Sequence, residues 1–62
     1  MDLNEAVKVP VNEILSESEK AWHILLDNGS QDWFPKSQCR IIEGILYLPK
    51  WIAEKKGIKN ED

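Results

Sequence analysis

The sequence predicts a mainly β fold: a small open barrel or twisted antiparallel sheet of four or five short strands, with a short C-terminal helix. Two observations predict it. Apolar stretches of strand length recur along the chain, separated by turn residues, and the last leads into a segment that begins with proline and ends with glycine, as short helices do. A barrel of Src-homology type is the first choice and one of oligonucleotide-binding type the second.

The first predicted strand is residues 7–11. Valine alternates there with Lys8 and Pro10, which indicates one buried face, and Pro10 places the strand at a sheet edge or a bulge because it has no backbone donor. Residues 12–20 fit either a helical turn or a continued strand followed by a turn, and we favour the second.

A hairpin is predicted next. Residues 21–26 form a strand that Asn28-Gly29 turns back into a second strand at residues 31–34, since both turn residues accept positive φ and such a turn matches strand twist. Pro35 ends this pairing. Along the rest of the chain we expect a tight or 3₁₀ turn at 36–38, strands at 39–42 and 45–48 around a Glu43-Gly44 turn, and a helix at 49–56 that starts on Pro49 and is capped by a left-handed Gly57.

The chain's 62 residues suffice for one domain, which we place at residues 1–58, with a polar tail at 59–62. A single Cys39 cannot form an internal disulfide, which favours a reducing compartment and a cytoplasmic location. Residues 1–5 lack the pattern of a signal peptide, and no window approaches about 20 apolar residues, so we expect neither export nor a membrane span.

Charge is unevenly distributed. The net charge is −3, yet residues 1–20 carry five acids and two lysines, whereas residues 36–62 carry six basic residues and four acids. A solvated surface of mixed charge explains this asymmetry best, although the second half could face something anionic.

Catalysis is not expected. His23 and Cys39 are the sole residues of their kinds, both fall in predicted strands, and nothing in the sequence brings them together with Ser37 as a nucleophile and its base. His23 is expected to pack or to face solvent, and Cys39 to be a small buried residue. No cofactor or metal is expected, because too few suitable ligands cluster.

Five aromatic residues are the richer signal. Trp22 shares a strand face with Ile24 and is expected in the core, whereas Trp33 and Phe34 point to opposite faces, so that one of them looks outward. An aromatic ring, two cations, a hydroxyl and an amide would then gather around one turn. The predicted binding surface comprises Trp33, Phe34, Lys36, Ser37, Gln38, Arg40 and Trp51.

Residues 33–38 (WFPKSQ) and 48–58 (LPKWIAEKKGI) resemble a group of small uncharacterised phage and bacterial proteins. These share a "Trp-apolar-Pro-Lys-Ser-Gln" turn and a "Pro-x-Trp-apolar-Ala-x-x-Lys-Gly" ending. The resemblance covers about residues 18–58 and implies a phage or mobile-element origin and a small binding role, often among genes of DNA metabolism. The connection at residues 42–45 is short where such relatives often carry a longer acidic loop.

The leading hypothesis is therefore a non-enzymatic binding module that engages a protein or nucleoprotein of DNA metabolism or host defence. The same aromatic and basic mixture also suits single-stranded nucleic acid, held by stacking and phosphate contacts, although the overall acidity argues against tight nonspecific binding. A structural homo-oligomer with its exposed tryptophans at the interface is the third possibility.

Overall fold

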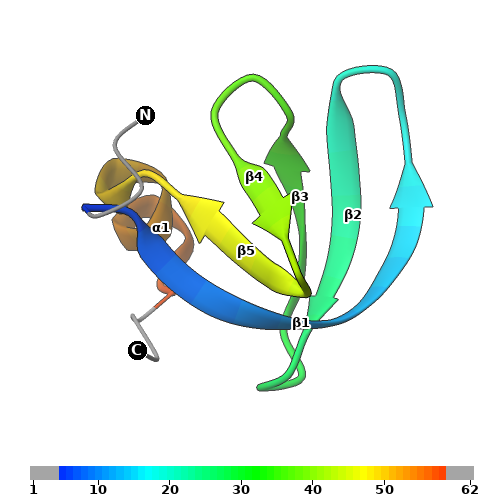
Figure 1. Ribbon diagram of the computed structural model, residues 1–62, viewed down its shortest axis with the longest axis horizontal. Helices are drawn as coiled ribbons and strands as arrows, with labels where there is room; N and C mark the ends of the chain where they lie inside the picture. The colour runs from blue at the N-terminus through cyan, green and yellow to red at the C-terminus, as the bar shows by residue number, and fades with distance from the viewer. Residues whose placement is uncertain (1–4, 59–62) are drawn as a thin grey trace.

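The computed structural model describes residues 5–58, and this part of the chain folds into five strands and one helix (Figure 1). The predicted mainly β fold with a short C-terminal helix is confirmed. The expectations for residues 1–4 and for a tail at 59–62 lie outside the described residues. The elements are β1 (Val7–Glu17), β2 (Ala21–Leu26), β3 (Gln31–Pro35), β4 (Arg40–Ile42), β5 (Ile45–Leu48) and α1 (Lys50–Lys56).

The strands form one antiparallel sheet in the order β3-β2-β1-β5-β4, and β1 belongs to both of its halves. Its beginning, from Val7 to Pro10, pairs with β5, and its continuation, from Val11 to Glu17, pairs with β2. The second pairing is interrupted by two register shifts. Such bulges bend a strand and increase its twist, and Figure 1 shows β1 curving through the molecule.

Of the two positions predicted for Pro10, a sheet edge or a bulge, the edge is wrong, because β1 is the central strand. Pro10 lies where β1 changes partner: its carbonyl accepts a hydrogen bond from the Asp27 amide (3.2 Å), and the next amide, of Val11, donates to Gly44 (2.9 Å). The register shifts come after Pro10, between Val11 and Ser16. A missing donor is tolerated at this changeover because the regular ladder to β5 ends there.

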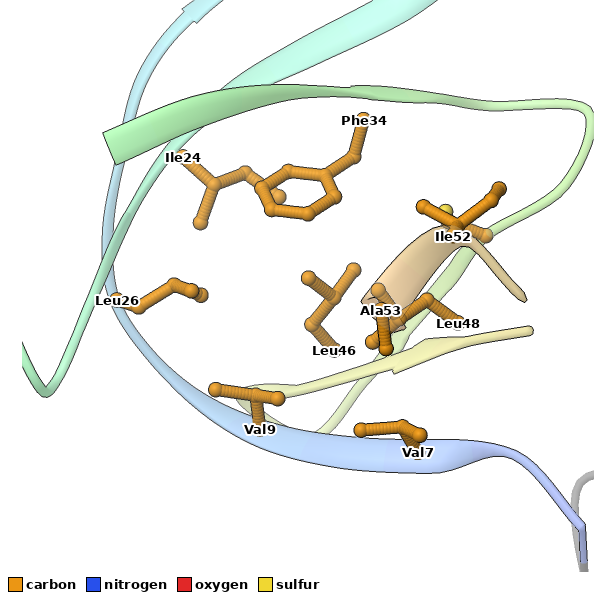
Figure 2. Close-up of a cluster of buried hydrophobic side chains, with 10 residues drawn as sticks. Val7, Val9, Ile24, Leu26, Phe34, Leu46, Leu48, Ile52 and Ala53 are labelled. Carbon is orange, nitrogen blue, oxygen red and sulfur yellow. The ribbon is translucent and has the colours of Figure 1, made fainter. Parts of the chain in front are cut away.

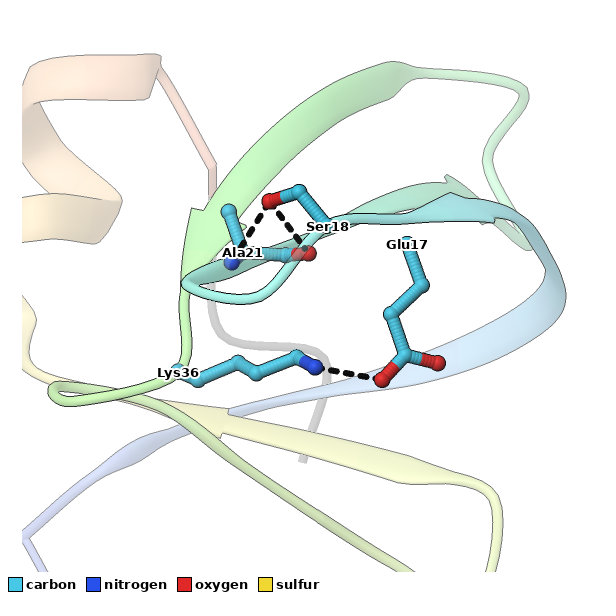
Figure 3. A network of polar contacts seen from close by, with 4 residues as sticks. All are labelled: Glu17, Ser18, Ala21 and Lys36. Atoms are coloured by element: carbon cyan, nitrogen blue, oxygen red, sulfur yellow. Dashed lines mark hydrogen bonds and ion pairs between the residues drawn. The ribbon is translucent and has the colours of Figure 1, made fainter.

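The preferred interpretation of residues 12–20 is confirmed, since β1 continues to Glu17 before a short turn. The Ser18 amide donates to the Ala21 carbonyl (2.8 Å), and the Ala21 amide donates to the Ser18 hydroxyl (3.1 Å; Figure 3). This reciprocal pair closes the β1–β2 connection.

Both predicted hairpin turns occur, but the tight turn expected at Asn28-Gly29 is found at Glu43-Gly44 instead. At the Asn-Gly turn only Gly29 has positive φ (88°), and the loop has three residues, with Leu26 donating to Ser30 (2.8 Å). The Asn28 side chain instead accepts the Ser30 amide (2.9 Å). The two-residue turn with positive φ at both positions is at Glu43 (50°) and Gly44 (79°).

One apolar cluster fills the concave side of the curved sheet and is closed by α1 (Figure 2). The helix begins one residue later than predicted, with Pro49 as its N-cap, and Gly57 has the predicted left-handed conformation (φ 71°). Its buried residues are Ile52 and Ala53, so the opposite side of α1 faces solvent. The cluster contains Val7, Val9, Ile24, Leu26, Phe34, Cys39, Leu46, Leu48, Ile52 and Ala53.

Candidate binding surface

Trp51 is the most exposed large apolar side chain of the described residues, at 58%. It lies in the first turn of α1, and because Ile52 and Ala53 turn the helix toward the core, Trp51 faces away from it. Its side chain borders two hollows of the surface. Trp51 is therefore the centre of the surface described below, which we call the Trp51 surface.

The larger hollow is a groove of about 560 Å³ between β3 and α1. Lys56 is held at its side: its ammonium is 3.1 Å from the Asp32 carboxylate and 5.4 Å from the centroid of the Phe34 ring. Lys55, by contrast, is exposed and forms no ion pair within residues 5–58. The groove is lined by Asp32, Pro35, Trp51, Ile52, Lys55 and Lys56.

The smaller hollow, of about 250 Å³, lies between the β3–β4 connection and the start of α1. Pro35 organises the connection, since its carbonyl accepts hydrogen bonds from the amides of Gln38 (3.1 Å) and Cys39 (3.0 Å). Arg40 makes one long hydrogen bond, of 3.4 Å, to the Cys39 carbonyl. The hollow is lined by Ser37, Gln38, Arg40, Pro49 and Trp51.

Four of the predicted site residues thus gather as expected, namely Ser37, Gln38, Arg40 and Trp51, and three do not. Trp33 is the outward member of its pair, with 45% exposure, but it lines neither hollow. On the outer face of the sheet its ring stacks on His23, with centroids 4.9 Å apart and planes 12° apart.

The Lys36 side chain likewise lines neither hollow. Its ammonium forms an ion pair with Glu17 (Figure 3) and lies 5.4 Å from the centroid of the Trp22 ring. Its backbone amide donates to Lys20 (2.8 Å). Lys36 therefore ties the β3–β4 connection to the β1–β2 hairpin.

Phe34 was predicted as a binding residue, and this is wrong. Its side chain is completely buried, next to Ile24 in the core (Figure 2). The alternation of β3 sends Phe34 inward and Trp33 outward, and the concave side is the one that α1 covers.

The exposed edge of β3 is partly closed by the side chain of Asp32, which belongs to the same strand. The Lys36 amide donates to the Lys20 carbonyl and the Leu26 amide to the Ser30 carbonyl, so the even-numbered residues of β2 and β3 form the hydrogen-bonded pairs. Because these pairs alternate with non-hydrogen-bonded ones, the Trp33 amide points away from β2. That amide donates to the Asp32 carboxylate at 2.7 Å. Pro35 carries no donor, so this edge is a poor template for an added strand.

Cys39 is buried as predicted, and burial raises the pKa of its thiol to about 11, with nearby Lys56 acting weakly in the opposite direction. A thiol with so high a pKa is almost entirely protonated at neutral pH and is a poor nucleophile. Within residues 5–58 no three His, Cys, Asp or Glu side chains are grouped as metal ligands would be, and no helix is long and apolar enough to cross a membrane.

Sequence reasoning missed the groove between β3 and α1. One signal for it was present: Trp51 and Lys55 are four residues apart in a predicted helix and therefore share a face. That Asp32 and Pro35 approach this face depends on the curvature of the sheet, for which the sequence has no simple pattern. Comparisons with protein-family models, curated proteins and solved structures found no match for this chain.

Proposed function

We propose that the chain is a small non-enzymatic binding module that engages a protein or nucleoprotein partner through the Trp51 surface. The observation that carries this proposal is a tryptophan that is 58% exposed on α1 and bordered by two hollows. Exposed indoles flanked by arginine and by apolar recesses are typical of the few residues that dominate the energy of protein interfaces.

The kind of partner follows from the resemblance of residues 33–38 and 48–58 to small phage and bacterial proteins. We place the module in a phage or mobile element, with a partner in DNA metabolism or host defence. Ser37 and Gln38 of the first motif, and Trp51 and Lys55 of the second, line the two hollows.

Affinity capture from the native host tests this proposal. The tagged wild-type protein should retain a partner that Trp51→Ala loses, because truncation removes the anchor while leaving the core untouched. Lys50→Gln is the matched control, since Lys50 is exposed on the same helix and lines neither hollow. Retention of the partner by Trp51→Ala at the wild-type level would show that the surface is not the binding site.

Single-stranded nucleic acid is a second candidate, favoured by one observation. Arg40 and Lys55 line the hollows that share Trp51, and neither has a carboxylate partner within residues 5–58. A base stacked on the indole could have its phosphates paired by these cations. Oligothymidylate should then quench tryptophan fluorescence in a salt-sensitive manner, and absence of quenching at low salt removes this candidate.

A further inference from the structure

We propose that the ligand of the Trp51 surface is a short acidic segment of a partner protein, in which carboxylates alternate with apolar side chains. This inference rests on the proposed function and names the class of partner. It is argued from the charge and polarity of the two hollows, from the placement of the other exposed tryptophan and from the size of the molecule.

The residues that line the smaller hollow suit an anionic ligand. The Ser37 hydroxyl, the Gln38 amide and the Arg40 guanidinium all have donors to offer, and none of the five lining residues is acidic. Within residues 5–58 the Arg40 side chain makes one hydrogen bond, at 3.4 Å to a backbone carbonyl, which leaves most of its guanidinium donors for a ligand. A planar guanidinium matches a carboxylate with two parallel hydrogen bonds.

The larger hollow adds an apolar requirement. Pro35, Ile52 and the Trp51 ring provide apolar wall, which a free anion would leave uncovered. Asp32 is the one acidic residue that lines this groove, and its carboxylate already pairs with Lys56 and accepts a hydrogen bond from the Trp33 amide. Among the charged residues that line the groove, Lys55 is therefore the one left to pair with a ligand. A ligand that covers both hollows therefore needs apolar groups beside negative ones.

The placement of the aromatic side chains favours a peptide over a nucleic acid. Successive bases of a single strand need successive stacking platforms along one basic groove. Here the second exposed tryptophan, Trp33, stacks on His23 and lines neither hollow. A peptide needs the one indole as an anchor.

The net charge of −3 does not forbid an acidic ligand. The described part of the molecule measures 26 × 24 × 23 Å, and the Debye length at physiological ionic strength is about 8 Å. Acids that lie farther than about this length from the Trp51 surface are thus largely screened from it. The local cations decide the attraction.

The inference is tested by titrating the ¹⁵N-labelled protein with blocked hexapeptides at physiological ionic strength. The probes are (Asp-Leu)₃, its uncharged counterpart (Asn-Leu)₃, and hexathymidylate. We expect (Asp-Leu)₃ to shift the Trp51 indole signal, and (Asn-Leu)₃ to bind at least about tenfold more weakly. Arg40→Gln should weaken (Asp-Leu)₃ binding about tenfold and Arg40→Lys by less, while Lys50→Gln, the matched loss of one positive charge, should change it by less than about twofold.

Each other outcome overturns the inference. Equal binding of the two peptides would make the surface a purely apolar one, and a Trp51 shift caused by hexathymidylate but not by (Asp-Leu)₃ would assign it to single-stranded nucleic acid. If no peptide binds while Trp51→Ala still loses the captured partner, the acidic class is wrong and the proposed function stands. If Trp51→Ala retains that partner, the proposed function itself fails.

Discussion

Phe34 and Trp33 are neighbours in the chain with opposite surroundings, fully buried and 45% exposed respectively. Removing a buried phenylalanine costs about 3–5 kcal/mol through lost burial and the cavity left behind. A 62-residue domain has a total stability of about 3–9 kcal/mol. At the scale of single residues, the core position therefore matters to folding far more than the surface one.

We accordingly predict that Phe34→Ala is largely unfolded, and that Phe34→Leu folds with a stability about 1–2 kcal/mol lower. Trp33→Ala loses its stacking on His23 and part of its burial, and should cost no more than about 1 kcal/mol. Urea denaturation followed by circular dichroism measures all three. A Trp33→Ala variant as unstable as Phe34→Ala would contradict the assignment of Phe34 to the core.

Cys39 provides a pH-dependent prediction. The thiol is fully buried, and burial raises its pKa from 9.0 to about 11, so the folded state binds its proton more tightly than the unfolded state does. This contribution to stability is complete below about pH 9 and is lost as the pH rises to about 11, by at most about 3 kcal/mol. Over this range the free energy of unfolding of the wild type should therefore fall relative to that of Cys39→Ala. A constant difference in stability between the two proteins from pH 8 to 11 would refute the prediction.

At the scale of elements, the turns show what local sequence can and cannot predict. Asn-Gly correctly predicted a hairpin, but the Asn28 side chain bonds to the Ser30 amide and stabilises a three-residue loop instead of the tight turn. The tight turn falls at Glu43-Gly44, where β4 and β5 are short and pair directly up to Ile42 and Ile45. Strand pairing selects the turn there and imposes a positive φ that glutamate does not favour.

This strain should be removable. Glu43→Asn places a residue that tolerates φ near 50° at an exposed site, and we predict a gain of about 0.5–1 kcal/mol in the free energy of unfolding. Glu43→Gln is the matched control, because it removes the same charge without the tolerance for positive φ. Equal stabilisation by the two substitutions would attribute the gain to charge.

The edge of β3 provides a second prediction at this scale. The Asp32 carboxylate accepts the Trp33 amide, so Asp32→Ala should accelerate hydrogen exchange of that amide by about fivefold to tenfold, as the loss of a hydrogen bond worth about 1 kcal/mol implies. Asp32→Asn keeps a side-chain oxygen and loses only the ion pair with Lys56, so the amide should stay protected. If both variants exchange at the wild-type rate, the carboxylate does not cap the edge.

At the scale of the whole molecule, the shared strand β1 explains why the candidate site was only half predictable. The sequence predicts each strand and the turn at 36–38, but it groups the outward member of the Trp33 and Phe34 pair with Lys36, Ser37, Gln38 and Arg40 on one surface. The curvature of β1 and the alternation of β3 divide that segment among three places: Trp33 outside, Phe34 in the core, and Arg40 beside Trp51. Alternation predicts that Trp33 and Phe34 face opposite ways, but which of them faces the core, and that Arg40 lies beside Trp51, depends on how the two halves of the sheet fold over one core, which no periodicity encodes.

That shared core leads to the last prediction. Val9 in β1 is fully buried in a cluster to which β2, β3, β5 and α1 all contribute, so neither half of the sheet has a core of its own. Val9→Ala should lower stability by about 2 kcal/mol and destabilise both halves equally. In a urea titration followed by NMR, the amides of Trp22 in β2 and Tyr47 in β5 should lose their native signals at one common midpoint, which moves by the same amount in the variant. Separate midpoints for the two amides would show that the half of the sheet around β2 and β3 and the half around β4 and β5 fold independently, despite sharing β1.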